Sequence, residues 1–358
     1  MTTVAELTRE LVSISSHEDE TAAGDFIEKW LREETAGEVV RDDVGNVIAR
    51  RGTGETSLAL VGHHDVVAPA ASQTNDEGEY IVEERDGRLY GRGTADMKGS
   101  VAAAMLAFRD ADPSCELVFA SFVGEETGGT GATHAINEGF APDFAIVGEG
   151  STNYSKPGVT DVVVAHKGGR GSTITVEGEP SHASEPSAGV NAIYRATEAI
   201  DLIRDLPRPH VEVFGEELSG TAVVTQIHDG GNASNVIPGQ CTLTVDERTV
   251  PGERVDLSQV ENIDGVEWTV NYDGPPMRCD DEAFAETVLA AAVDAQDGEP
   301  ELTTKPHVTD AGRLVGAGVT CVVCGASEPG EAHTDTESAN LEVLERCYRI
   351  YRGTAERL

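Results

Sequence analysis

Four short runs of the chain place acidic or imidazole side chains just after an apolar stretch. These runs are Gly62-His63-His64-Asp65, Gly93-Thr94-Ala95-Asp96, Gly124-Glu125-Glu126 and Gly148-Glu149. A further candidate, His333, lies near the C-terminus. Imidazole nitrogens and carboxylate oxygens without thiolates suit zinc, with cobalt or manganese as substitutes. The sequence therefore predicts a site for two divalent metal ions that activate water for hydrolysis.

The residue types allow a role to be assigned to each expected ligand. Two adjacent ions need one carboxylate that bridges them and terminal ligands for each ion. We assign Asp96 as the bridge. We assign His63 and Glu149 to one ion, and Glu126 and His333 to the other.

Two further acids lie beside these ligands. Glu125 cannot easily share an ion with its neighbour Glu126, so we assign it as the general base that deprotonates a metal-bridging water and protonates the leaving amine. Asp65 suits an acceptor for the other N–H of the His63 imidazole. Taken singly, such acids are often helix caps, turn formers or solvated surface groups. The order of the motifs, which ends with His333, favours the metal site.

Short apolar strands must position these side chains. Residues 58–61, 118–123 and 145–147 are apolar apart from Ser121, which is typical of parallel strands buried on both faces. In open α/β sheets, ligands bind at the carboxyl ends of strands near a switch in strand order. We therefore expect the side chains that follow these strands to converge at one edge of a sheet.

The pattern of elements changes twice along the chain. Residues 1–167 alternate helices, at 22–32 and 98–110, with strands near Val47 and Leu58. Residues 168–274 predict strands at 172–176, 221–227, 241–245 and 266–272 and a helix at 191–206. Residues 275–358 return to helix, strand and helix, at 283–295, 319–323 and 341–352. We predict an α/β catalytic domain with a mixed, mostly parallel sheet flanked by helices, formed by residues 1–167 and 275–358, and an inserted α+β domain at 168–274.

The charge of the chain is strongly negative. The net charge is −38, from 64 Asp and Glu against 26 Lys and Arg, and the acids are spread along the chain. Nucleic acid is therefore not an expected partner. A uniformly acidic, lysine-poor surface keeps a protein hydrated in concentrated salt, so we infer a salt-adapted cytoplasm such as that of haloarchaea. An ordinary acidic bacterial enzyme is the alternative.

The N-terminal residues and the apolar runs favour a cytoplasmic protein without a membrane partner, and the cysteines favour core packing. Residues 1–16 have a helical pattern with charges at Glu6, Arg9 and Glu10 rather than a signal peptide, and no apolar run approaches membrane-spanning length. Cys321 and Cys324 form a C-x-x-C motif, but the apolar residues around them predict a buried strand. We predict no disulfide and no structural zinc site there.

Three of the motifs resemble those of a known enzyme family. The matching runs are Gly62-His63-His64-Asp65-Val66-Val67, Gly91-Arg92-Gly93-Thr94-Ala95-Asp96-Met97-Lys98-Gly99 and Gly124-Glu125-Glu126. They resemble the co-catalytic zinc metallopeptidase family of succinyl-diaminopimelate desuccinylase, acetylornithine deacetylase, aminoacylase-1 and carboxypeptidase G. The resemblance covers nearly the whole chain and implies a zinc-exopeptidase-like catalytic domain with an inserted ferredoxin-like lid or dimerisation domain. It also implies a small N-acyl amino acid as substrate and a homodimer formed through the insertion.

The same resemblance implies residues that contact the substrate. Ser181-His182-Ala183-Ser184 matches a stretch whose histidine stabilises the oxyanion, often from the partner subunit. The desuccinylase pattern is matched by Arg170, Asn235 and Arg248, with Arg313 as a further anchor for substrate carboxylates. Alternatively, Arg170 is a surface cation and Arg248 forms a surface ion pair. The Arg313 segment departs from the family pattern, because Asp310 stands one place early.

The functional prediction is a two-metal amidohydrolase that removes an acyl group, with succinyl ranked first, from an N-acylated amino or diamino acid such as N-succinyl-diaminopimelate. The alternatives are an acetylornithine deacetylase, a hydrolase of carrier-protein-linked lysine or ornithine, and a dipeptidase or carboxypeptidase. Glu149 argues against N-terminal peptide cleavage, since the aminopeptidase relatives tend to carry Asp there. A carrier protein would need a basic rim, and this chain has few cations. Outside the enzymes, the alternative is a binding module without catalysis, which the complete set of expected roles disfavours.

Overall fold

The computed structural model describes residues 2–231 and 233–358. Two compact units make up the chain. The larger unit consists of Met1–Ala165, Arg278–Lys305 and Thr309–Leu358, and the smaller unit of His166–Met277 and Pro306–Val308.

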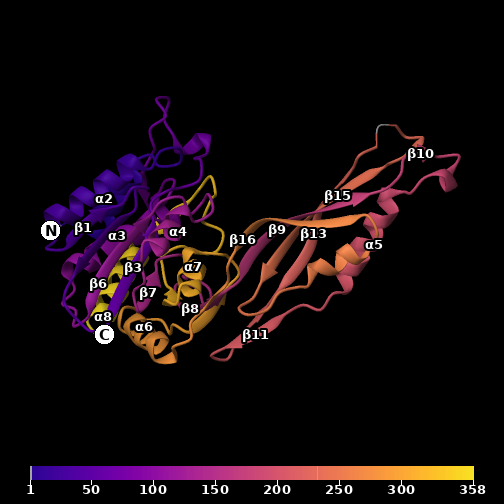
Figure 1. Cartoon of the computed structure of the whole chain (residues 1–358). Helices are drawn as coiled ribbons and strands as arrows, with labels where there is room; N and C mark the ends of the chain where they lie inside the picture. Colours follow the sequence, from indigo (N-terminus) through magenta and orange to yellow (C-terminus); the bar gives the residue numbers. More distant parts are fainter. Residues whose placement is uncertain (1, 232) are drawn as a thin grey trace. The chain divides into compact units, whose positions relative to one another are not determined.

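A mixed sheet forms the centre of the larger unit (Figure 1). Within the described residues this sheet has nine strands, in the order β1-β2-β6-β3-β7-β19-β8-β17, with β18 also paired with β8. The strands β6, β3, β7 and β19 are parallel to one another, whereas β2 pairs antiparallel with both β1 and β6, and β8 pairs antiparallel with β19. The bounds are β1 Glu38–Arg41, β2 Val47–Arg51, β3 Ser57–His63, β6 Glu116–Phe122, β7 Phe144–Val147, β8 Val162–His166, β17 Met277–Arg278, β18 Leu302–Lys305 and β19 Thr320–Val323. The predicted α/β class with a mixed sheet is confirmed.

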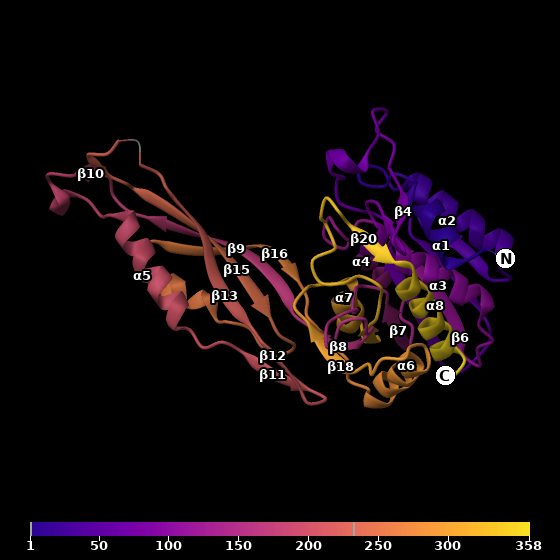
Figure 2. The same ribbon diagram turned by 180° about the vertical axis from the view of Figure 1, so that it is seen from behind.

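Helices flank this sheet (Figure 1). Their bounds are α1 Val4–Val12, α2 Thr21–Glu34, α3 Gly99–Asp110, α4 Thr130–Asn137, α6 Glu282–Asp294, α7 Asp310–Gly316 and α8 Leu341–Ala355, with short helical turns at Ala71–Gln73 and Thr94–Lys98. Helix α3 packs against β3 and β6 and also against α8, which lies beside it in Figure 2. Every residue from Gly99 to Phe108 is buried as a result. Small side chains such as Ala102 and Ala103 permit this close packing on two sides.

The register of the central strands brings their carboxyl ends to one edge. In the β3–β6 pair His63 lies opposite Phe122, and in the β3–β7 pair Val61 lies opposite Val147. The residues that follow β3, β6 and β7 therefore emerge at the same edge of the sheet, as expected for parallel strands.

A second, small sheet holds the C-terminal segment near this edge. Within the described part of the chain it contains three antiparallel strands in the order β20-β5-β4. The bounds are β4 Glu83–Arg85, β5 Arg88–Tyr90 and β20 Ser338–Asn340. This pairing fixes residues just after His333 beside residues just before Asp96, and the sequence pattern did not predict it.

The smaller unit is an antiparallel sheet with one long helix. Its main sheet has the order β13-β15-β9-β16, and α5 packs on one face of it (Figure 2). Helix α5 buries Ala192, Ala196, Ala199 and Ile203, a stripe that follows the helical period. The bounds are β9 Gly168–Glu177, β10 Ser181–His182, α5 Ala192–Asp205, β11 His210–Val213, β12 Glu216–Ser219, β13 Thr221–Asp229, β14 Val236–Ile237, β15 Gln240–Thr249 and β16 Val266–Gly274, with short helical turns at Pro186–Ala188 and Leu257–Asn262. The role of this unit as a lid or dimerisation domain stays a prediction.

The cysteines are structural. All six are free and buried, and Cys321 lies within strand β19. Among the described residues, no helix combines the length and the apolar character that crossing a membrane requires.

Candidate metal centre

Five of the expected ligands come together in the larger unit as two overlapping groups. The first group is His63, Asp96 and Glu149, and the second is Asp96, Glu126 and His333. In each group the residues offer ligand atoms that all lie within 4.8 Å of one another. Asp96 is the member that the two groups share.

The distances place Asp96 between the two imidazoles. Its Oδ1 lies 3.1 Å from Nε2 of His63, and its Oδ2 lies 3.3 Å from Nε2 of His333. Nε2 of His63 lies 3.3 Å from Oε1 of Glu149, and Nε2 of His333 lies 2.9 Å from Oε1 of Glu126. Each half of the site thus offers one imidazole, one terminal carboxylate and one oxygen of Asp96. This is the donor set of two divalent ions bridged by a carboxylate.

Strand ends and tight turns deliver these side chains. His63 is the last residue of β3, and Glu149 follows β7 by two residues. Glu126 lies in the turn after β6, which begins at Gly124 with a φ of +62°. A Cβ at Gly124 would also clash with the hydroxyl of Thr130, so glycine is required there on both grounds.

Asp65 connects the two strand ends. Its Oδ1 lies 3.2 Å from Nδ1 of His63, whose Nδ1 also lies 3.1 Å from the Asp65 carbonyl oxygen. Its Oδ2 accepts a hydrogen bond of 2.9 Å from the backbone N–H of Glu126. The side chain is buried, and although burial would raise the pKa of this carboxyl, its bonds to His63 and to the backbone lower it. Asp65 is therefore placed to orient the imidazole of His63 and the turn that carries Glu126.

Glu125 belongs to neither ligand group. Burial raises its pKa well above the usual value for a glutamate, and the nearby carboxylates of Glu149, Asp310 and Asp96 add to this shift. A carboxyl group of raised pKa beside a metal site is suited to accepting and returning a proton near neutral pH.

The electrostatics of the site fit a pair of cations. Burial raises the pKa of Glu126 and raises that of Asp310 to about 7, and neighbouring carboxylates add to both shifts. The hydrogen bonds to Asp96 and Glu126 raise the pKa of His333 to about 10. An imidazole must be neutral to bind a metal ion, so divalent ions held here would displace the proton that this pKa favours. The donor set and its charge both suit two divalent ions.

The sequence reasoning missed Glu337, which holds the turn that carries Asp96. Oε1 of Glu337 accepts hydrogen bonds from the backbone N–H groups of Gly93, Ala95 and Asp96, at 3.0, 3.0 and 3.1 Å. Its Oε2 accepts a bond of 2.6 Å from Arg92, and both side chains are buried. The only sequence signal was an acid four residues after His333.

The sequence reasoning also missed Lys305, the last residue of β18. Its Nζ lies 3.2 Å from Oε2 of Glu149, and both side chains are buried. The one available signal was scarcity, since the chain has only five lysines.

His64, to which we had assigned no role, faces the core. Its Nδ1 lies 2.9 Å from the hydroxyl of Ser121, and the side chain is fully buried. Burial lowers the pKa of His64 to about 3.

We expect His64 to make the fold sensitive to acid. The folded protein keeps this imidazole neutral down to about pH 3, whereas the unfolded chain protonates it near its ordinary pKa of about 6.5. Its contribution to stability is therefore present above pH 6.5 and is lost as the pH falls toward 3. Near pH 5 the loss would be about 2 kcal/mol. In His64→Gln, urea unfolding of the metal-free protein should show a smaller fall in stability between pH 7 and 5. Equal falls in both proteins would contradict this assignment.

In the smaller unit, the structure brings His182 and Asn235 together. Nδ2 of Asn235 lies 3.2 Å from Nε2 of His182, and Nδ1 of His182 lies 2.6 Å from the hydroxyl of Ser184. His182 is exposed on the short strand β10. Its role toward an oxyanion and the role of Asn235 toward substrate stay predictions.

The three expected arginine anchors all bind groups of the protein. In the smaller unit, Arg170 donates to Asp273 at 3.0 Å, and Arg248 makes two bonds to Asp246 at 2.9 and 3.0 Å. In the larger unit, Arg313 donates to the carbonyl oxygen of Gly128 at 2.6 Å. Their roles in substrate binding stay predictions, and each would require the arginine to exchange or share its present partner.

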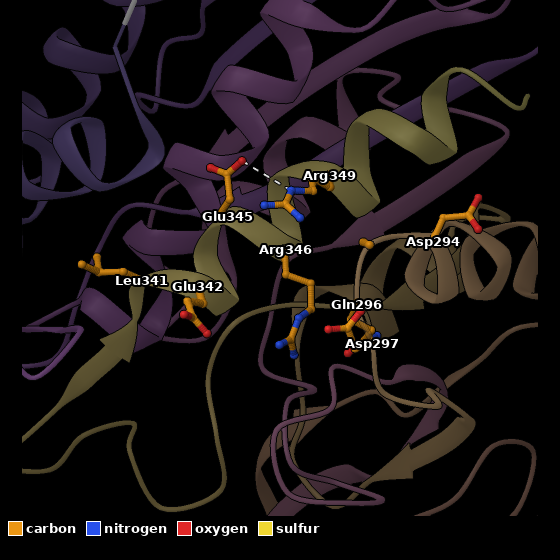
Figure 3. A pocket seen from close by; sticks show the side chains of 9 residues that line it. Asp294, Gln296, Asp297, Leu341, Glu342, Glu345, Arg346 and Arg349 are labelled. Carbon is orange, nitrogen blue, oxygen red and sulfur yellow. Dashed lines mark ion pairs between the residues drawn. The ribbon is translucent and has the colours of Figure 1, made fainter.

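A cavity of about 550 Å³ in the larger unit is separate from this cluster. Figure 3 shows it between the end of α6 and helix α8, with Arg346 and Arg349 among its lining side chains. Arg346 donates to the carbonyl oxygen of Gly158 at 2.7 Å, and Arg349 pairs with Glu345 at 3.5 Å. None of the expected ligands lines this cavity, and its two arginines already have protein partners.

The chain is similar to known proteins in sequence and in fold. Residues 59–357 match the family described as Peptidase family M20/M25/M40. An acetylornithine deacetylase of Myxococcus xanthus is 31% identical over 336 residues, which cover 86% of this chain and 84% of that protein. The aminopeptidase PepT of Bacillus cereus has a similar fold, with a TM-score of 0.81 at 21% identity over 99% of this chain and 98% of that one. The YXEP protein of Bacillus subtilis, described as a dinuclear metal binding peptidase, has a TM-score of 0.70 at 17% identity over 98% of this chain and 96% of that one.

Proposed function

We propose that this chain, which belongs to the peptidase family M20/M25/M40, is a metal-dependent deacylase of N-acylated amino acids. Membership of the family makes it a metallohydrolase of the peptidase or deacetylase type. The observation that carries the finer proposal is the pair of ligand groups that share Asp96, with Glu125 next in sequence to the ligand Glu126. Such an arrangement suits hydrolysis of a linear amide by water.

Different residues have different roles in the proposed reaction. Two divalent ions held by the two groups would polarise the amide carbonyl and acidify the attacking water. Glu125 takes a proton from that water, and the same carboxyl group then returns it to the nitrogen of the departing amine. Asp65 keeps His63 in one orientation throughout, because its carboxylate and its carbonyl oxygen both face Nδ1 of the imidazole.

As the acyl group removed from the substrate, we rank acetyl ahead of succinyl. The preference for succinyl depended on arginine anchors for a second substrate carboxylate. Arg170, Arg248 and Arg313 each already have a protein partner, and an acetyl group needs no such anchor. The similarity to acetylornithine deacetylase over most of the chain supports the same order.

A hydrolysis panel with metal analysis tests the proposal. The purified protein, stripped by chelation and reloaded with Zn²⁺, Co²⁺ or Mn²⁺, would be offered N-acetylornithine, N-succinyl-diaminopimelate and a dipeptide. Because a salt-adapted protein is expected, each assay would be run in dilute buffer and in molar-range KCl. We expect about two metal ions per chain and the highest kcat/KM for the acetylated substrate. Turnover of the dipeptide alone, or of none of the three by a fully loaded protein, would refute it.

A further inference from the structure

The two oxygens of Glu149 face different partners. Oε1 lies 3.3 Å from Nε2 of His63, on the side where the first ligand group converges. Oε2 lies 3.2 Å from the ammonium group of Lys305. The carboxylate therefore presents one oxygen to the metal site and uses the other in an ion pair.

This ion pair lies in the interior of the larger unit. Lys305 is 5% exposed and Glu149 is 9% exposed. Burial alone would lower the pKa of Lys305, but the charge of Glu149 raises it, so the lysine carries its proton. A buried ammonium–carboxylate pair of this kind is costly to break, because the group left behind is an uncompensated charge.

The other terminal carboxylate has no comparable partner. Among the described residues, Glu126 pairs with the imidazole of His333 and with no lysine or arginine. The two halves of the site therefore differ in one positive charge and in the freedom of their terminal carboxylate. A carboxylate can bind a metal ion through one oxygen or through both, and the second mode takes up an additional coordination position.

We propose that Lys305 is a positioning residue that restricts Glu149 to binding a metal ion through Oε1 alone. The proposal rests on the proposed function only for the presence of the two ions. By occupying Oε2, Lys305 leaves one more position around that ion for water or substrate than a bidentate carboxylate would leave. It also weakens the negative field of that half of the site, so the two ions are expected to bind with unequal affinity.

The test uses Co²⁺-loaded protein, whose visible absorption depends on coordination number. Lys305→Met keeps a long unbranched side chain and removes the charge. We expect this variant to bind two Co²⁺ ions per chain, to show weaker visible absorption per ion because Glu149 becomes bidentate, and to lose about 10- to 100-fold in kcat. Lys305→Arg restores a cation and should absorb more like the wild type. Lys156→Met is the matched control, since Lys156 is an exposed lysine paired with Glu301. This variant should change neither the absorption per ion nor kcat.

A second variant covers the case in which Lys305→Met does not fold. Glu149→Gln offers one amide oxygen to the ion. If wild-type Glu149 already binds through one oxygen, the Co²⁺ absorption per bound ion should be nearly unchanged in Glu149→Gln. A clear increase in absorption would mean that Glu149 was bidentate, and would overturn the proposal.

The outcomes separate this inference from the proposed function. Unchanged absorption and turnover in a folded Lys305→Met would refute the role of Lys305 while leaving the deacylase intact. A Lys305→Arg variant that folds and behaves like Lys305→Met would refute the requirement for a cation. The expected absorption changes in a protein that hydrolyses no substrate of the panel would support the role of Lys305 and refute the deacylase.

Discussion

Replacement of Glu125 by Gln is expected to lower kcat by about 10³-fold while the protein still holds two metal ions per chain. The amide has nearly the same shape as the carboxylate but cannot accept the proton of the attacking water. Because Glu125 belongs to neither ligand group, its loss should leave metal binding intact. Steady-state kinetics on the acetylated substrate and metal analysis of the same preparation measure the two effects.

The adjacent residue provides a matched control. Glu126 lies 2.9 Å from His333 within the second ligand group. Glu126→Gln should therefore lose much of its metal content, and its activity should recover partly when excess metal is added. If Glu125→Gln instead lost metal, or kept more than a tenth of the wild-type kcat, the assignment of Glu125 as the general base would be wrong.

The second large effect is expected at Glu337 and concerns stability. Glu337→Gln places an amide N–H₂ group against Arg92 and leaves that buried guanidinium without a carboxylate. Breaking a buried ion pair by removing one partner destabilises a protein by about 3–5 kcal/mol. We expect a loss of that size in the free energy of unfolding, measured by denaturant titration of the metal-free protein. The affinity for metal should also fall, because the turn that carries Asp96 loses its negatively charged acceptor.

Glu345→Gln serves as the control for this measurement. Glu345 pairs with Arg349 at 3.5 Å on the surface of α8, where such pairs contribute about 0.5 kcal/mol or less. Comparable stability of the Glu337 and Glu345 variants would show that the buried pair is dispensable.

Much of the site could be predicted because parallel strands impose local rules. Apolar runs followed closely by His63, Glu126 and Glu149 indicate strands whose carboxyl ends meet, and the structure brings these residues to one edge. Each such residue lies at the end of the strand that positions it or a few residues after it. A local pattern was therefore sufficient.

The supporting residues could not be predicted in this way. Lys305 meets Glu149 across 156 residues of chain, and Glu337 meets Asp96 across 241. Neither follows a repeat or a motif that marks its partner. The partners of the arginines were equally hidden, because an arginine near a turn has the same local sequence whether it binds substrate, a carboxylate or a backbone carbonyl.

In the fold, too, elements with a local sequence signal could be predicted and those that depend on distant segments could not. Long elements were predicted: the helix expected at 98–110 corresponds to α3, and the alternating strand expected at 172–176 lies within β9. The three-residue strands β4, β5 and β20 are too short to carry a period of two. The pairing of β20 with β5 also joins segments about 250 residues apart, and the local pattern does not contain such a contact.

Because Glu337 holds the turn that carries Asp96, the order of synthesis decides when the chain can bind its metal ions. The ribosome produces β3, β6 and β7 well before it reaches His333 and Glu337. A nascent chain therefore carries a crowded set of acids without the final imidazole or the acceptor that fixes the Asp96 turn. We expect both ions to be retained only once residues 333 and 337 have been synthesised, so that truncation before residue 333 yields a strand core that cannot retain both cations.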